Sequence, residues 1–169
     1  MKLTTKQLTL CALLTCMALA LSYMEGLFPV LIPLPGVKLG LANIVTVFAL
    51  YALGPGQALL ILLGRCLLGA VFAGNMSALL FSLLGGTAAM LMMIGLSRLR
   101  GLSVYGVSIG GAAAHNCGQV AAAILTLGNT APLYYLPVLL GVSLLTGAVT
   151  GLVSACLFRA LAHTGLALG

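Results

Sequence analysis

Long apolar segments with almost no charge inside them make up most of the chain. A helix needs about 20 apolar residues to cross the hydrocarbon core of a bilayer. Charged residues are 5% of the chain, against about a quarter in a soluble domain, which is too few to cover a water-facing surface. The sequence predicts an all-α integral membrane protein, one domain over residues 1–169 folded as a single bundle of six transmembrane helices at residues 7–27, 40–53, 57–73, 78–96, 103–127 and 136–161.

The second span is short for a full crossing, and another apolar run precedes it. Pro29, Pro33 and Pro35 interrupt that run, and proline disrupts regular helix. We expect this first connection to dip into the membrane as an ordered cap.

The basic residues near the ends of the spans predict the orientation. Six spans place both termini on one side of the membrane, and that side then holds Lys2, Lys6, Arg98, Arg100 and Arg159. By the positive-inside rule this side is the cytoplasm. We therefore expect a multi-pass protein of the bacterial cytoplasmic (inner) membrane, with cytoplasmic N and C termini and with Glu25 and Lys38 toward the outer face.

A signal peptide is the alternative interpretation of the N-terminal segment. A basic start precedes an apolar run, and Ala18-Leu19-Ala20 resembles a small-residue cleavage site. Cleavage would leave five spans and move Arg98 and Arg100 to the outer side, against the charge rule.

The acidic content excludes several classes of enzyme. Glu25 is the single acidic residue, so the chain has no paired carboxylates for hydrolysis, no Asp-rich Mg²⁺ site and no Walker B acid, and it lacks a Walker A pattern. The net charge of +6 comes from few, scattered basic residues, so no nucleic-acid partner is expected. We expect neither catalysis nor a cofactor nor a metal site, since no metal-ligand spacing links Cys11, Cys16, Cys66, Cys117 and Cys156.

Polar side chains inside the spans are the first candidates for function, because they are expensive to bury in lipid. Arg65 lies about eight residues, roughly 12 Å, inside the third span. It either pairs with Glu25 or helix-end carbonyls, or contacts a ligand. In the fifth span His115 and Gln119 share a helix face, and Asn116 lies between them. We favour the lining of a pocket for these three over a structural hydrogen-bond network.

The segment from Pro33 to Asn43 delivers Lys38 and Asn43 to the outer mouth of the second span. Lys38 either holds an anionic group as a point charge or extends to the membrane interface. We expect an outward-opening pocket for a polar or anionic molecule with an apolar portion. Its expected lining is Glu25, Lys38, Asn43, Arg65, His115, Asn116, Gln119 and Tyr135.

Small residues at four-residue spacing let helix backbones approach closely in lipid. Most of these, such as Gly147 and Gly151, are expected to pack within the bundle. Ala12, Cys16 and Ala20 form a similar stripe on the first span, which we single out as a docking face for another membrane subunit.

Several short blocks are distributed over nearly the whole chain: Glu25, the run Pro35-Gly36-Val37-Lys38-Leu39-Gly40-Leu41-Ala42-Asn43, Arg65, Gly85-Gly86, Ser108, Gly111, His115-Asn116-x-Gly118-Gln119 and Tyr135-x-Pro137. This combination resembles the Gx transporter family, which is also catalogued as heptaprenyl diphosphate synthase component I. The relatives that the resemblance implies are the substrate-binding S components of energy-coupling factor (ECF) vitamin transporters.

S components are six-helix membrane proteins that capture a substrate from outside, so the resemblance implies that function here. In S components a small-residue stripe on the first helix docks on a transmembrane coupling subunit. The resemblance implies the same role here for Ala12, Cys16 and Ala20. Cys16 departs from the all-alanine pattern of that stripe. The implied partners are the lipid bilayer, a small-molecule substrate, a transmembrane coupling subunit and ATPase subunits in trans.

The synthase name of the family implies a different class of function. A prenyl diphosphate synthase binds Mg²⁺-diphosphate through Asp-rich motifs, so a chain without aspartate is not its catalytic subunit. The alternative function is a non-catalytic membrane accessory subunit in isoprenoid or quinone biosynthesis, or in a redox system. Proton-linked transport through Glu25 and His115 is a third hypothesis.

Overall fold

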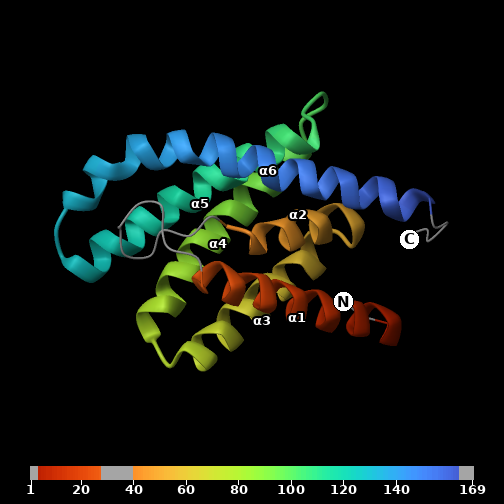
Figure 1. Cartoon of the computed structure of the whole chain (residues 1–169), viewed down its shortest axis with the longest axis horizontal. Helices are drawn as coiled ribbons and strands as arrows, with labels where there is room; N and C mark the ends of the chain where they lie inside the picture. The colour runs from red at the N-terminus through yellow and green to blue at the C-terminus, as the bar shows by residue number, and fades with distance from the viewer. Residues whose placement is uncertain (1–3, 28–39, 164–169) are drawn as a thin grey trace.

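The computed structural model describes residues 4–27 and 40–163, and within them the chain is helical and has no strand (Figure 1). The elements are α1 (Thr5–Leu27), α2 (Ala42–Ala52), α3 (Pro55–Ala73), α4 (Met76–Ser97), α5 (Val104–Leu127), the short 3-10 helix η1 (Ala131–Tyr135) and α6 (Leu136–His163). All six predicted helices are present. The proline-rich connection, and Lys38 with it, lies outside the described residues.

Proline, glycine and capping side chains set the helix ends. α3 begins at Pro55, where the missing N–H of proline removes no helical hydrogen bond. The side chains of Asn75 and Ser103 cap α4 and α5 by accepting a backbone N–H from the first turn. Gly74 and Gly128 end α3 and α5 in the left-handed conformation that glycine adopts without strain. These local signals explain why the ends of the helices follow the sequence pattern closely.

Four helical segments of the described chain are long and apolar enough to cross a membrane: Thr5–Leu27, Pro55–Ala73, Met76–Ser97 and Ala131–Ala160. Large apolar side chains such as Val71, Phe72 and Leu145 point outward and are exposed. A water-facing surface of this kind would be unfavourable, whereas lipid accepts it. The chain is therefore a multi-pass membrane protein.

α2 differs from the other helices in length and burial. It has 11 residues, about 16 Å at 1.5 Å per residue, which is shorter than the hydrocarbon core of about 30 Å. Val47 and Ala49 are fully buried in it, and it contacts α1, α3, α4 and α6. The second predicted span is thus a short helix that its neighbours enclose.

Glycines bring α5 into close contact with both of its neighbours. α5 packs extensively on α4 and on α6, and Figure 1 shows α5 and α6 side by side. A Cβ atom on Gly118 would lie 2.4 Å from the carbonyl oxygen of Leu84, and one on Gly147 would lie 2.5 Å from the Cα of Ile109. Gly147 packs within the bundle, as its spacing predicted. Close packing on both sides holds the polar residues of α5 inside the protein.

Candidate functional site

A small cavity inside the bundle gathers polar side chains from five helices or their ends. We call it the polar cavity; its lining residues are Ser22, Glu25, Gly40, Asn43, Arg65, Phe81, Ser82, His115 and Gln119. Its volume is about 20 Å³, which is space for about one water molecule. The structure thus brings together five of the predicted site residues: Glu25, Asn43, Arg65, His115 and Gln119.

Glu25 joins the end of α1 to the start of α2. Its Oε1 accepts a hydrogen bond from the backbone N–H of Gly40 at 2.5 Å. The carbonyl oxygen of Gly40 in turn accepts the N–H of Asn43 at 2.8 Å. Gly40 has a φ of +81°, and a Cβ there would lie 3.0 Å from Nδ2 of Asn43. Glycine at this position therefore allows both the turn and the close approach of the Asn43 amide.

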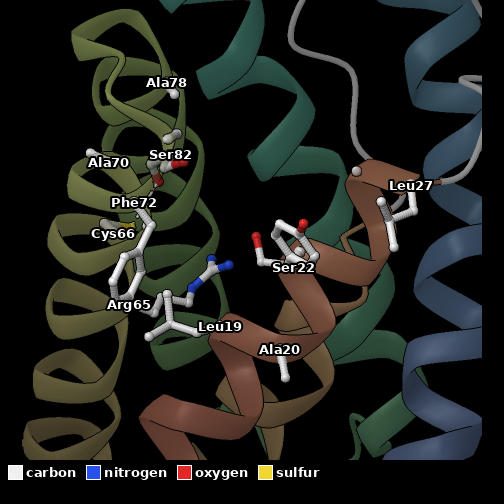
Figure 2. A pocket seen from close by; sticks show the side chains of 14 residues that line it. Leu19, Ala20, Ser22, Leu27, Arg65, Cys66, Ala70, Phe72, Ala78 and Ser82 are labelled. Atoms are coloured by element: carbon white, nitrogen blue, oxygen red, sulfur yellow. Dashed lines mark hydrogen bonds between the residues drawn. The ribbon is translucent and has the colours of Figure 1, made fainter.

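Arg65 is the buried cation of the cavity, with 8% of its surface exposed. Its Nε and Nη2 atoms are buried, and neither has a hydrogen-bond partner within residues 4–27 and 40–163. The negative charge of Glu25 attracts the positively charged guanidinium electrostatically. Figure 2 shows the Arg65 side chain pointing from α3 toward α1, where Ser22 lies. Buried donors without acceptors are costly, so this arrangement is suited to an acceptor that the described chain does not supply.

His115 and Gln119 face α4 from one side of α5, one helical turn apart. A Cβ on Gly85 would lie 2.9 Å from Cε1 of His115 and 3.2 Å from Cγ of Gln119. The absence of a side chain at Gly85 thus makes room for both residues. Oε1 of Gln119 is buried and has no hydrogen-bond partner in the described part of the chain.

Three of the predicted site residues are not placed in the polar cavity. Nδ2 of Asn116 donates a hydrogen bond to the carbonyl oxygen of Leu139 at 2.8 Å, which links α5 to α6. Tyr135 ends η1, is 47% exposed and does not line the polar cavity. Lys38 falls in the segment that the structure leaves undescribed.

A larger groove opens beside the polar cavity, between α1, α3 and the start of α4. We call it the α1–α3 groove; its lining residues are Leu19, Ala20, Ser22, Tyr23, Gly26, Leu27, Arg65, Cys66, Gly69, Ala70, Phe72, Ala73, Ala78 and Ser82 (Figure 2). Its volume is about 670 Å³. Arg65, Ser22 and Ser82 line both spaces, so the groove and the polar cavity lie on either side of these three side chains.

Ser22, Phe81 and Ser82 also line the polar cavity and were not among the predicted site residues. Serine is common in membrane helices, where its hydroxyl often bonds to the backbone of its own helix. A single serine or phenylalanine in an apolar span therefore gives no signal of a site, and only the tertiary arrangement identifies these residues.

The small-residue stripe of α1 lies on the outside of the protein. Ala12, Cys16 and Ala20 are all exposed. Ala20 also lines the α1–α3 groove. The stripe is thus accessible to another membrane helix.

Comparison with known proteins identifies the family. Residues 14–157 match the family described as heptaprenyl diphosphate synthase component I. The chain belongs to this family. No curated protein is significantly similar to this member of the component I family in sequence.

The chain also shares its fold with a solved structure, described as that of the S component of a bacterial ECF transporter. The two superpose with a TM-score of 0.69 at 20% sequence identity, over 95% of this chain and 98% of that chain. The resemblance to the component I family and to ECF S components is thereby confirmed. At this level of identity, the likeness to the S component establishes the fold alone.

Proposed function

We propose that this protein is a membrane-embedded, substrate-binding subunit of an ECF-type uptake transporter. One observation carries the proposal: polar residues from α1, α3 and α5 and from the start of α2, far apart in sequence, line one buried cavity in a protein with the S-component fold. Polar groups are expensive to bury in a membrane unless they serve a ligand or one another. The subunit would capture a small polar or anionic molecule from the outer side, without catalysis.

The five predicted site residues that line the polar cavity each have a proposed role. Arg65 binds an anionic group of the substrate through its two unsatisfied donors. Asn43, His115 and Gln119 form hydrogen bonds with the substrate. Glu25 holds the start of α2 and balances the charge of Arg65.

Lys38, Asn116 and Tyr135 do not share these proposed roles in the polar cavity. Lys38 is proposed from the sequence alone as a second cation at the outer mouth. We assign no substrate contact to Asn116, whose amide bonds to α6, or to Tyr135, which is exposed outside the polar cavity.

The transport cycle requires partners, because the chain has no Walker A pattern to bind ATP. We propose a transmembrane coupling subunit that docks on the exposed stripe of Ala12, Cys16 and Ala20, together with ATPase subunits in trans. Arg98 and Arg100 are exposed at the turn between α4 and α5. By the positive-inside rule that turn and both termini lie in the cytoplasm, and the membrane is the bacterial inner membrane.

The test is a gentle-detergent affinity purification from the native host, with mass spectrometry of everything that stays bound. We expect a coupling subunit, ATPases and a retained small molecule. Arg65→Gln and Gln119→Ala should lose the small molecule and keep the subunits, whereas the control Val71→Ala, at an exposed position on α3, should keep both. Purification of the folded wild-type protein with no ATPase would overturn the proposal.

The family name favours a second function, a non-catalytic membrane accessory subunit in isoprenoid or quinone biosynthesis or in a redox system. The same purification distinguishes the accessory subunit from the transporter subunit. A soluble prenyltransferase or redox proteins would then be recovered in place of the ATPases.

A further inference from the structure

We propose that the ligand of this protein is a single-chain amphiphile, with an anionic head group bound at Arg65 and an apolar chain lying in the α1–α3 groove. The chain would leave the protein sideways, between α1 and α3, toward the surrounding lipid. This inference rests on the proposed function and specifies its substrate class.

The two adjacent spaces differ greatly in size. The polar cavity, at about 20 Å³, holds about one water molecule. The α1–α3 groove, at about 670 Å³, falls within the range of roughly 300–1,000 Å³ that is usual for small-molecule sites. Most of a ligand that reaches Arg65 must therefore lie in the groove and only its polar end near the polar cavity.

The lining of the groove selects an apolar chain. Along α3 the wall is formed by Gly69, Ala70, Phe72 and Ala73, and Leu19 and Leu27 of α1 face them. Among the described residues of the groove, Arg65 has the only charged side chain. Ser22, Tyr23 and Ser82 offer hydroxyls, but most of the described wall is apolar. A polar substrate that filled this volume would lose more hydration than these few groups could replace, which is unfavourable.

The donors of Arg65 select the head group. Nε and Nη2 hold their N–H groups in parallel along one edge of the guanidinium, and both atoms are buried and lack an acceptor in the described part of the chain. The guanidinium or the side chains that cover it must therefore shift for a head group to reach these two donors from the groove. This edge matches two oxygens of a carboxylate or phosphate. Ser22 faces the guanidinium from α1 (Figure 2) and offers a hydroxyl at the junction of the two spaces.

The depth of Arg65 favours a single-chain amphiphile over a bilayer phospholipid. Arg65 lies about 15 Å from the start of α3 and about 12 Å from its end, at 1.5 Å per residue. The head group of a two-chain phospholipid stays at the membrane interface, whereas a slim single-chain anion can follow the groove to this depth.

The shape of the α1–α3 contact provides the lateral opening. At one level the helices touch, because a Cβ on Gly64 would lie 3.3 Å from Cγ2 of Thr15. The groove begins beside this contact, at Arg65 on α3 and one turn further along α1 at Leu19, and it extends to the ends of both helices. The exposed side chain of Phe72 stands at its rim.

The experiment measures binding of labelled dodecyl phosphate to the full-length protein in phosphatidylcholine nanodiscs, with empty nanodiscs subtracted. Ala70→Phe and Ala73→Phe place a ring in the groove, and Val71→Phe places the same ring on the exposed face of α3 as a matched control. We expect both groove variants to weaken binding at least about tenfold, with no change for Val71→Phe. Ala73 is exposed, so Ala73→Phe remains a test if Ala70→Phe does not fold.

The head group is tested separately with Arg65→Gln and with methyl phosphate as competitor. We expect Arg65→Gln to lose dodecyl phosphate, and methyl phosphate to compete with it in wild-type protein and to bind equally well to Ala73→Phe. If groove variants bind dodecyl phosphate normally while Arg65→Gln does not, the chain site is wrong and the proposed polar site stands. If Arg65→Gln binds normally, the Arg65 role in the proposed function fails as well. Displacement by nanodiscs of phosphatidylglycerol would identify a bilayer lipid as the occupant and overturn the inference.

Discussion

The carboxylate of Glu25 and the backbone N–H of Gly40 form a hydrogen bond of 2.5 Å across 15 positions of sequence. The single acidic side chain of the chain is thus committed to the junction between α1 and α2, and at the same time it lines the polar cavity. The position of Asn43 depends on this junction, because its N–H bonds to the carbonyl of Gly40. The architecture of the site and its electrostatics therefore share one residue.

Replacing Glu25 separates these two contributions. Glu25→Gln keeps an oxygen acceptor for the Gly40 N–H and removes the charge, whereas Glu25→Ala removes both. Because a hydrogen bond to a charged group contributes about 1.5–3 kcal/mol, we expect the melting temperature to fall more for Glu25→Ala than for Glu25→Gln. Thermal unfolding followed by circular dichroism in detergent measures this. Equal melting temperatures for the two variants would show that the bond to Gly40 does not stabilise the junction.

The fit of α4 against His115 and Gln119 predicts the effect of a single methyl group. Gly85→Ala would place a Cβ 2.9 Å from Cε1 of His115, so both polar side chains must move. We expect retained small molecule in the purified protein to fall at least about tenfold. Gly95→Ala, on the same helix, adds a Cβ with nothing within 4 Å.

Gly95→Ala should keep wild-type retention and gain up to about 1 kcal/mol of stability from reduced backbone entropy. Retention by Gly85→Ala at the wild-type level would contradict the proposed positions of His115 and Gln119 in the binding site.

The contact of Gly118 with α4 predicts a folding defect instead of a binding defect. A Cβ on Gly118 would lie 2.4 Å from the carbonyl oxygen of Leu84 and 2.8 Å from the Cα of Gly85. Backbone atoms cannot rotate away as a side chain does, so α4 and α5 would have to separate, at a cost of about 1–3 kcal/mol or more. We expect a lower folded yield for Gly118→Ala by size-exclusion chromatography. Gly141→Ala, with open space around its Cβ, serves as the control and should match the wild-type yield.

The sequence predicted the helices and much of the polar cavity because membrane spans contain few polar groups. Glu25, Arg65 and His115 stand out against an apolar background, and the structure places them in one cavity. Asn116 differs because successive residues on a helix point about 100° apart, so it faces α6 when His115 and Gln119 face α4. Proximity in sequence suggested one cluster, but the helical period divides it.

The burial of α2 and the presence of the α1–α3 groove could not be predicted from the sequence. The buried position of α2 depends on its four neighbouring helices, and its apolar composition fits a lipid-facing helix equally well. The α1–α3 groove arises where two helices that touch near Gly64 leave a gap beyond it. Its small and apolar residues are the same types that would close such a gap, so its presence depends on helix geometry alone.

Asn116 and Gln119 on α5 lie in different environments, one bonded to α6 and the other in the polar cavity, so their replacement should have different effects. Asn116→Ala removes the hydrogen bond to the carbonyl of Leu139 and should lower the free energy of unfolding by about 1 kcal/mol. It should leave substrate retention unchanged, because Asn116 does not line the polar cavity. Gln119→Ala should instead reduce substrate retention and leave the free energy of unfolding near the wild-type value. The buried Oε1 of Gln119 has no hydrogen-bond partner in the described residues, so its removal breaks no such bond. Melting temperature and retained small molecule, measured on the same two preparations, test the pair. Loss of substrate by Asn116→Ala with an unchanged melting temperature would return Asn116 to the binding site and require a different orientation of α5.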